Sequence, residues 1–282
     1  MKLTIGLCTY DDYDGAFFTI QALRMYQNLP KDTQIIVIDN NPNSAHGKAL
    51  KPFVEDWVHG TYIPYTAKQS TSNRNLVFKH SKGDYTLCVD SHVLIEQNGV
   101  TALIDYYDKN PDTKNIVTGP LWYDDLVNYS THFEPKWQDI MYGTWGSNTE
   151  EYLKGDLFEI PMMGLGLFSC KTSNWLGFNE HFTGFGGEEG YIHEKFRRNG
   201  GKSICIPQLK WNHRFGRPNG IPYKNRMEDR IWNYYIGWLE LFGDINHPSI
   251  QTITDAFKGR VPDETLSNLL ETANYTNKFV CE

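Results

Sequence analysis

The 282-residue sequence has few of the features that mark secreted proteins. Its five cysteines are odd in number and include no Cys-x-x-Cys pair, which is not the pattern of a disulfide framework. Cys8, Cys88 and Cys205 lie inside apolar runs, where a free thiol behaves as a small hydrophobic side chain. The sequence therefore predicts a reducing, cytoplasmic setting.

Long hydrophobic runs and an excess of positive charge are also missing. No window approaches the roughly 20 apolar residues of a membrane span, and the apolar stretch within residues 1–7 is too short for the core of a signal peptide. We therefore expect no membrane partner. The net charge of −7 argues against broad, non-specific nucleic-acid binding, although it is compatible with a local basic patch.

The first half of the chain alternates regularly between strand and helix patterns. The expected strands are unbroken apolar runs, often β-branched, which is typical of a mostly parallel sheet covered by helices on both faces. The predicted fold class is therefore α/β with a Rossmann-like central sheet. We expect strands at residues 3–8, 34–38, 62–65 and 85–89, and helices at 15–28, 47–58, 70–80 and 100–110.

The second half shows weaker periodicity. Residues 123–159 are rich in Tyr, Trp, Asn and Asp and are interpreted as a long functional loop region with one edge strand. The turn-rich residues 214–225 have the composition of a lid. We predict a catalytic domain over residues 1–225, including this lid, and a helical extension over 226–282 that packs on it. The remaining elements expected are helices at 191–198, 226–242 and 265–273 and a strand at 202–206.

Two separate runs provide candidate metal ligands. The apolar residues 85–89 are followed by Asp90-Ser91-His92, which places a carboxylate and an imidazole at the carboxyl edge of a sheet, and His213 follows another strand-like run. If these strands are parallel, all three side chains lie at one edge. One carboxylate and two imidazoles suit Mn²⁺ or Mg²⁺ and leave positions for water and phosphate oxygens. Alternatively, Asp90 caps a turn and His213 is a structural imidazole.

Polar residues also follow the first two expected strands. Asp39 ends the second strand, where an acidic residue can accept a hydrogen bond from a ribose or a base. Thr9, Tyr10 and Asp11 follow the first strand and have the same interpretation. The alternative for both positions is a turn in which the Asx side chain bonds its own backbone.

Three charged residues lie on expected helices or directly before them. Arg74 precedes Asp90 by 16 residues and could reach a diphosphate, because its planar fork matches phosphate oxygens; otherwise it is a surface arginine. Glu188 and Glu189 follow two glycines and open a helix. They are candidate catalytic carboxylates, although acidic residues also favour helix N-termini through the helix dipole alone.

The expected lid carries a further candidate group. Arg214, Arg217 and Tyr223 could clamp a diphosphate once the lid has closed. The alternative is a solvated basic loop.

Taken in order, these motifs resemble GT-A glycosyltransferases of the family-2 kind, and more closely the polypeptide N-acetylgalactosaminyltransferases. The residues that carry the resemblance are Asn73-Arg74-Asn75, Gly83-Asp84, Asp90-Ser91-His92, the segment 162–169, Phe185-Gly186-Gly187-Glu188-Glu189, and Trp211-Asn212-His213-Arg214-Phe215. Phe185 stands where the family usually has Trp, and the lid is shifted, which leaves the diphosphate-binding arginine open between Arg214 and Arg217.

The resemblance implies a role for each matching position. Asp90, His92 and His213 would be the metal ligands, Gly164 would lie beneath the donor sugar, and Glu188 would contact sugar hydroxyls. The implied activity is metal-dependent transfer of a sugar from a nucleotide-diphosphate donor, a UDP-sugar, to a hydroxyl with retention at the anomeric carbon.

Other activities stay open at this stage. An inverting enzyme would need a base, for which Glu188 or Glu189 is the first candidate. The acceptor could be a glycan, a peptide or a hydroxymethylated base of phage DNA, the last of which requires base flipping. A nucleotide-sugar hydrolase, a binding protein and a non-catalytic scaffold are further alternatives.

Overall fold

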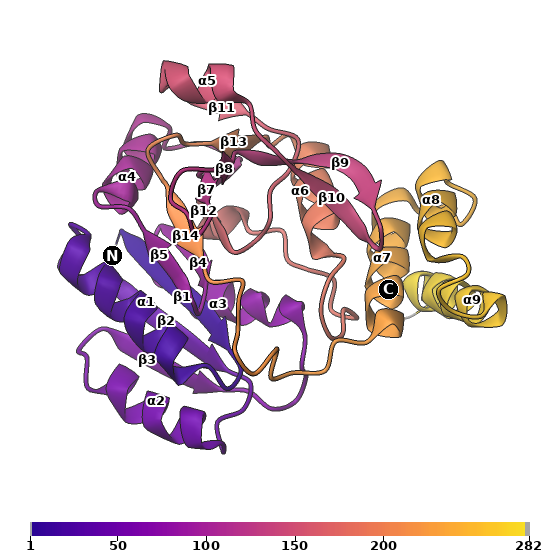
Figure 1. The fold of residues 1–282 in the computed structure, drawn as a ribbon, viewed down its shortest axis with the longest axis horizontal. Coiled ribbons are helices and arrows are strands. Elements are labelled where there is room, and N and C mark those ends of the chain that lie inside the picture. Colours follow the sequence, from indigo (N-terminus) through magenta and orange to yellow (C-terminus); the bar gives the residue numbers. More distant parts are fainter. Residues whose placement is uncertain (1, 280–282) are drawn as a thin grey trace.

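The computed structural model describes residues 2–279, and over these residues the chain forms a central eight-stranded sheet (Figure 1). In spatial order the strands are β11 (Phe158–Glu159), β13 (Ser203–Cys205), β6 (Ile116–Thr118), β12 (Leu167–Lys171), β4 (Tyr85–Asp90), β1 (Leu3–Thr9), β2 (Gln34–Asp39) and β3 (Gly60–Pro64). β1 is parallel to β2 and β4, β2 to β3 and β6 to β13, whereas β12 is antiparallel to β4 and β6 and β11 is antiparallel to β13. The predicted α/β class with a mostly parallel sheet is therefore confirmed.

Helices cover both faces of this sheet because its central strands are apolar on both sides. Successive side chains of a strand point to opposite faces, so Ile35 and Val37 of β2 join one hydrophobic core while Ile36 and Ile38 join the other. The first core contains residues of α1 (Tyr13–Tyr26), α2 (Ala45–Glu55) and α4 (Gly99–Lys109). The second contains residues of α3 (Arg74–His80) and α6 (Glu188–Arg198).

The elements predicted in the first half are present, with ends displaced by a few residues. The expected helix at 70–80 begins instead with a 3-10 turn, η1 (Thr71–Asn73), because the Ser70 hydroxyl accepts the Ser72 amide and tightens the first turn. The α-helix proper begins at Arg74. A second 3-10 turn, η2 (Thr172–Asn174), follows β12.

The middle of the chain differs from the prediction. Residues 123–159 are not a long loop, because they contain the hairpin of β9 (His132–Gln138) and β10 (Met141–Gly146), the helix α5 (Thr149–Lys154) and the short strands β8 (Tyr129–Ser130) and β11. The hairpin strands carry polar and aromatic residues instead of β-branched runs, so they lack the pattern used for the prediction. Ring contacts such as Phe133 with Trp145, at 4.2 Å between centroids, stabilise them instead.

A second, smaller sheet lies beside the central one. It has the order β5 (Val93–Ile95), β14 (Trp211–His213), β7 (Leu121–Trp122) and β8. The condition under which His213 was expected at the same edge, a strand parallel to those of the central sheet, is not met: β14 lies outside that sheet and is antiparallel to β5.

The C-terminal helices pack against the rest of the chain. They are α7 (Met227–Phe242), α8 (Pro248–Phe257) and α9 (Asp263–Phe279). α8 was not predicted and α9 is longer than expected. Ile231 and Ile236 of α7 belong to the same core as Ile36 and Ile38, so this region shares a core with the sheet. Residues 280–282, the end of the predicted extension, lie outside the described residues.

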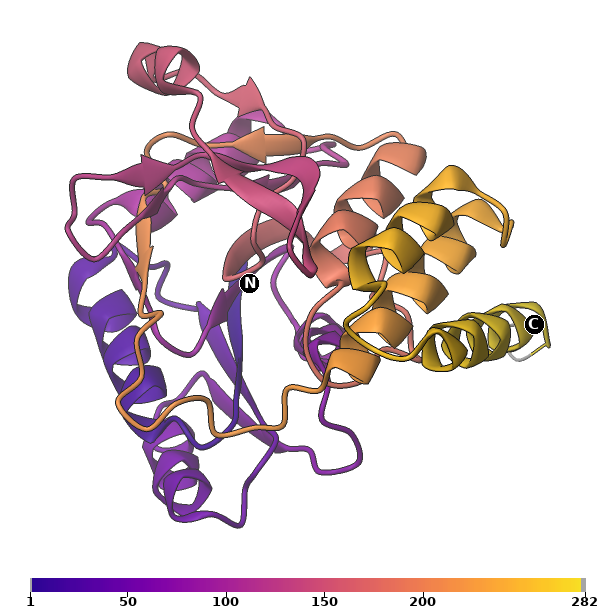
Figure 2. The ribbon, with the colours of Figure 1, turned by 45° about the vertical axis from the view of Figure 1, so that its right-hand side comes forward.

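Between β14 and α7, the segment 214–226 has no helix or strand and crosses from the second sheet to the C-terminal helices in two views (Figures 1 and 2). This is the segment expected to form a lid. None of the helices that the structure describes combines the length and the apolar character that a membrane crossing requires.

Candidate active site

A cavity of about 630 Å³ opens at the carboxyl edge of the central sheet. β1 and β4 are neighbours there, with Cys8 opposite Asp90, so the residues that follow the two strands meet. Thr9, Tyr10 and Asp12 line the cavity from the β1 side, and Asp90, Ser91 and His92 line it from the β4 side. Residues 66–71, residues 183–185 and four residues of the segment 214–226 form further parts of the wall.

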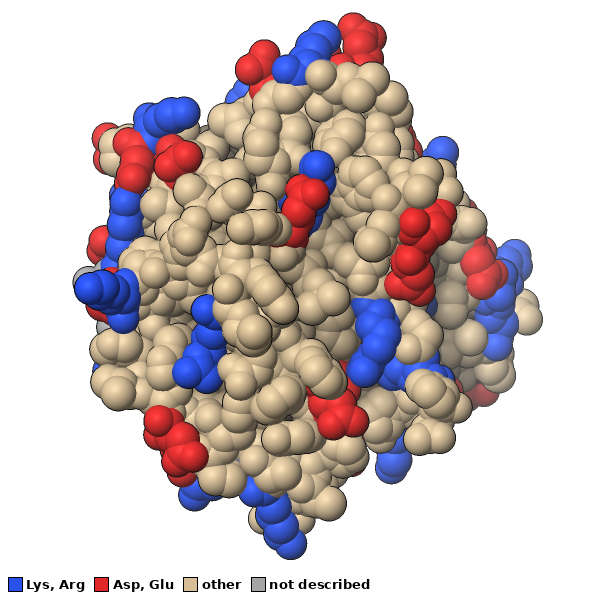
Figure 3. Space-filling model, turned by 60° about the vertical axis from the view of Figure 1, so that its left-hand side comes forward, with Lys and Arg blue, Asp and Glu red and all other residues tan. Residues whose placement is uncertain are grey.

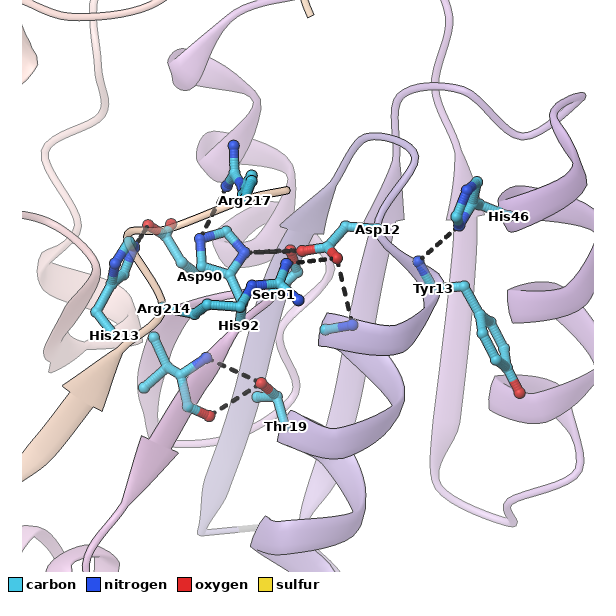
Figure 4. A network of polar contacts seen from close by, with 12 residues as sticks. Asp12, Tyr13, Thr19, His46, Asp90, Ser91, His92, His213, Arg214 and Arg217 are labelled. Carbon is cyan, nitrogen blue, oxygen red and sulfur yellow. Dashed lines mark hydrogen bonds and ion pairs between the residues drawn. The ribbon is translucent and has the colours of Figure 1, made fainter. Parts of the chain in front are cut away.

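The three predicted metal ligands come together in this cavity. One ligand atom from each of Asp90, His92 and His213 can be chosen so that all three lie within 4.8 Å of one another. His213 Nε2 is 3.3 Å from Asp90 Oδ2, and the two imidazole centroids are 4.6 Å apart (Figure 4). His213 arrives by antiparallel pairing, since its register partner on β5 is Val93, the residue directly after His92.

The geometry of this cluster fits a divalent cation. Ligand atoms about 2.1–2.6 Å from a shared ion lie roughly 3–5 Å from one another. The donor set of one carboxylate and two imidazoles is suitable for Mn²⁺. The tautomer of His92 also fits: Arg217 Nη2, which only donates, lies 3.0 Å from His92 Nε2, so this nitrogen carries a lone pair.

Asp90 is kept ionised by its surroundings. Burial alone would raise the pKa of its carboxyl, but Arg74, His213 and His92 together hold that pKa well below its usual range. Arg74 Nη2 donates to Asp90 Oδ1 at 2.8 Å, and the arginine is buried at the cavity wall, so it is not a surface residue. The carboxylate is therefore available as a ligand through Oδ2.

The two glutamates on α6 lie behind the cavity wall. Glu188 Oε1 is 3.6 Å from Arg74 Nη1, and Glu188 Oε2 is buried without a hydrogen-bond partner among the described residues. Burial raises the pKa of Glu188, and burial followed by repulsion from Glu188 raises the pKa of Glu189 to about 8. Neither residue is among those that line the cavity.

Asp39, Asp11 and Gly164, which were also predicted as site residues, lie outside the cavity lining. Asp39 accepts the Asn41 amide at 2.8 Å and the Tyr62 hydroxyl at 2.6 Å, which is the turn that was the alternative interpretation. Asp11 accepts from Asn41 Nδ2 at 3.0 Å. Gly164 packs against Phe133 and Trp145.

The glycine that lies close to the metal cluster is Gly166. Its carbonyl accepts the Asp90 amide at 2.8 Å. A Cβ atom there would lie 2.9 Å from the Trp211 ring and 3.3 Å from the His213 ring, so a side chain would displace Trp211 and crowd His213.

The three candidate residues of the expected lid do not all face the cavity. Arg217 and Tyr223 line the cavity, with the guanidinium 5.9 Å from the ring centroid, and Tyr223 contacts the rings of Tyr10 and Phe185. Arg214 does not line the cavity and instead donates to Asp12 Oδ1 at 2.8 Å. Of the two arginines, Arg217 is therefore the one that faces the interior.

Sequence reasoning missed Asp12, which has more contacts in this site than Asp11. Its carboxylate accepts from His92, Ser91, Arg214 and the Gly15 amide. Burial would raise the pKa of Asp12, but the hydrogen bonds and charges of His92 and Arg214 hold it well below its usual range. The available signal was an aspartate just before the helix pattern, where a helix N-cap is expected.

The fold is similar to that of solved glycosyltransferase structures. GalNAc-T7 with UDP, GalNAc and Mn²⁺ superposes with a TM-score of 0.73 at 14% identity, over 100% of this chain and 57% of that one. The present chain thus spans little more than half of GalNAc-T7. S. aureus TarS in complex with UDP-GlcNAc gives a TM-score of 0.56 at 13% identity, over 99% of this chain and 73% of that one.

A third similar structure is the mannosyltransferase PcManGT from Pyrobaculum calidifontis in complex with GDP-Man and Mn²⁺. It gives a TM-score of 0.57 at 13% identity, over 100% of this chain and 88% of that one. At these identities the likeness concerns the fold, which is the GT-A fold. A comparison with curated protein sequences gave no significant match.

The family profile described as Glycosyl transferase family 2 matches residues 4–165, which is more than half of the 282 residues. This match includes β1 from its second residue, β2, β4 and the Asp90-Ser91-His92 run at the cavity. The chain therefore belongs to glycosyl transferase family 2.

Proposed function

We propose that this glycosyltransferase moves a sugar from a UDP-sugar to an acceptor hydroxyl with the help of Mn²⁺ or Mg²⁺ held by Asp90, His92 and His213. The observation that carries the proposal is the gathering of these three side chains at one cavity. It is supported by the similar structures that contain UDP, GalNAc and Mn²⁺, or UDP-GlcNAc. The closer likeness to polypeptide N-acetylgalactosaminyltransferases is part of this proposal.

The residues around the cavity have complementary roles in this proposal. The ion, when bound, neutralises charge that develops on the leaving diphosphate. Arg74 keeps Asp90 ionised, and Arg217 presents a guanidinium to the cavity that can pair with phosphate oxygens. Thr9 and Tyr10 form the wall on the nucleoside side, and Thr9 Oγ1 is buried without a partner among the described residues.

We propose retention at the anomeric carbon, with the departing phosphate oxygen taking the proton of the acceptor. A base for inversion must come within hydrogen-bond reach of the acceptor hydroxyl. Glu188 and Glu189, the first candidates for that role, do not line the cavity, and the pKa of each is raised. Product-anomer NMR tests the assignment, and an inverted product would overturn it.

For the acceptor we propose a hydroxyl of a glycan or a peptide in preference to a base of DNA. On the face shown in Figure 3, acidic and basic side chains lie interspersed in small groups between broad areas of other residues. Backbone-driven DNA binding relies on clustered positive charge, which this face does not present among the residues drawn.

We further propose the domain division made from the sequence. Residues 1–225 form the catalytic unit with 214–225 as its lid, and 226–282 form the helical extension. The shared core of α7 and β2 supports an extension that is packed firmly on the catalytic unit.

The test is nucleotide release from a panel of UDP- and GDP-sugars, with Mn²⁺, with Mg²⁺ and with EDTA. We expect Asp90→Ala and His213→Ala to abolish transfer, while His80→Ala, an exposed histidine on α3, retains it. Full activity of Asp90→Ala, or of the wild type in EDTA, would contradict the metal assignment.

A further inference from the structure

We propose that Asp12 is a positioning residue that holds the His92 ring with Nε2 directed at the metal position. This inference rests on the proposed function, because it concerns how one proposed ligand is kept in a binding-competent state. Asp12 is not among the proposed ligands, and its carboxylate is next to the cluster on the side of α1 (Figure 4).

The contacts of Asp12 fix the orientation of the His92 imidazole. Asp12 Oδ2 lies 2.8 Å from His92 Nδ1 and 3.1 Å from the Ser91 hydroxyl. The side chains of Asp12 and His92 are only 15% and 8% exposed, so water does not replace these bonds easily. Because the buried hydrogen bond ties Nδ1 to α1, rotation of the ring would break it and leave a carboxylate unsatisfied.

The same contact selects the tautomer. An ionised carboxylate only accepts hydrogen bonds, so His92 Nδ1 carries the proton and Nε2 carries the lone pair. Arg217, which can only donate, faces Nε2 at 3.0 Å and requires the same arrangement. A metal ligand needs this lone pair, and carboxylates that accept from the other ring nitrogen are the usual partners of metal-bound histidines.

The backbone around Asp12 is built to present its carboxylate. Asp11 has φ +51°, a left-handed conformation that is uncommon for a residue other than glycine, and it turns the chain directly before Asp12. Asp12 is also the N-cap of α1. A Cβ on Gly15 would lie 2.4 Å from Asp12 Oδ2, so only glycine leaves room for the carboxylate there.

α1 and the segment after His92 are fastened together. The Thr19 hydroxyl of α1 donates to the Val93 carbonyl and accepts the Val93 amide, both at 2.9 Å (Figure 4). The helix that carries Asp12 is therefore held directly against the residue that follows His92. This makes the distance from Asp12 to His92 a property of rigid elements and not of a flexible loop.

His213 provides an internal contrast. Its Nδ1 is buried and has no hydrogen-bond partner within the described part of the chain. Its ring is held by contacts with Trp211 and Phe215, at centroid distances of 6.4 and 4.4 Å. Of the two imidazoles, only His92 is oriented by a carboxylate through its second nitrogen, so loss of Asp12 is expected to act through His92.

The test compares Asp12→Ser with Asp14→Asn. Serine at position 12 keeps an N-cap for α1 but is too short to reach His92. Asp14 is an exposed aspartate two residues away, and its change to Asn removes the same amount of charge. Mn²⁺ affinity is measured by electron paramagnetic resonance without donor, and the His92 tautomer by ¹⁵N NMR of histidine-labelled protein, with His92→Gln identifying its signals. These readouts do not depend on turnover.

We expect Asp12→Ser to bind Mn²⁺ about 10- to 100-fold more weakly and to lose the pure Nδ1-protonated signal, while Asp14→Asn matches the wild type in both. Gly15→Ala crowds the Asp12 carboxylate without removing it and should also weaken Mn²⁺ binding. This variant replaces Asp12→Ser in the test if Asp12→Ser does not fold.

Two contrary outcomes are distinguishable. If His92→Gln weakens Mn²⁺ binding but Asp12→Ser and Gly15→Ala bind it as the wild type does, the positioning role is wrong and the metal site stands. If His92→Gln and Asp90→Ala also bind Mn²⁺ normally, the metal site of the proposed function is itself wrong.

Discussion

Arg217 Nη2 lies 3.0 Å from His92 Nε2, the nitrogen that the proposed metal would use. The lid arginine therefore directs a positive charge at the position where the cation is expected. Arg217 and the ion cannot both use the same lone pair. Metal binding should accordingly release Arg217 from His92 and free its guanidinium for phosphate oxygens.

The first prediction concerns Arg217→Ala. We expect Mn²⁺ to bind several-fold more tightly without nucleotide, because a competitor for His92 has been removed. UDP should bind more weakly in the presence of Mn²⁺, because a phosphate partner has been lost. Calorimetric titrations of Mn²⁺ and of UDP measure the two effects, and Arg24→Ala, an exposed arginine on α1, is the control. Weaker Mn²⁺ binding by Arg217→Ala would contradict the competition.

The second prediction concerns Arg74, which is buried against Asp90 and Glu188. Arg74→Met leaves the carboxylates without their cation, and breaking such a buried pair costs about 3 kcal/mol of unfolding free energy. Denaturant unfolding at neutral pH measures this, with Arg197→Met, an exposed arginine on α6, for comparison. Equal stability of the two variants would show that Arg74 does not hold these charges.

The third prediction concerns the pKa of Glu189, which burial and then repulsion from Glu188 raise to about 8 from the ordinary 4.5. Between these pH values Glu189 holds a proton in the folded chain that it has lost in the unfolded chain. The contribution of this protonation to the free energy of unfolding is therefore complete below pH 4.5 and falls as pH rises to about 8. Glu189→Gln should therefore gain unfolding free energy relative to the wild type as pH rises from 5 to 9.

The control for this measurement is Glu180→Gln, which neutralises an exposed glutamate. Its difference from the wild type should stay flat over the same pH range. A flat difference for Glu189→Gln as well would mean that Glu189 is ionised in the folded protein.

The fourth prediction concerns His193, which is 2% exposed and whose pKa burial lowers to about 4. Below pH 6.5 the unfolded chain binds a proton that the folded chain does not, so stability falls as pH decreases towards 4. We expect a loss of about 2 kcal/mol from this histidine between pH 7 and pH 5. His193→Gln should lack that loss. Denaturant unfolding of both proteins at pH 7 and pH 5 measures it, and a wild type that loses no stability between these pH values would contradict the prediction.

Local sequence was sufficient for the central strands and for two of the proposed ligands. Residues 34–38 form an unbroken apolar run that is stable only between two covered faces, and they lie buried in β2. Asp90 and His92 are adjacent to the end of β4, so their position at the sheet edge followed from the strand alone.

Other features were beyond local patterns. The hairpin of β9 and β10 carries polar and aromatic residues, and its stability comes from ring contacts between strands. Asp39 and Asp12 are both aspartates near strand ends, yet one closes a turn and the other accepts from His92. The partner of each aspartate depends on which other segments of the chain pack beside it and not on its own local sequence.

An α/β sheet of buried apolar strands and an Asp-x-His run at its edge could be predicted from the residues alone, because apolar runs and strand period are local properties. That His213 completes the cluster follows only from long-range strand pairing. It arrives through the pairing of β14 with β5, across more than 100 residues of chain, and only that register places its ring beside Asp90. Such pairings are chosen by packing and hydrogen bonding over the whole fold, for which no short stretch of residues carries a signal.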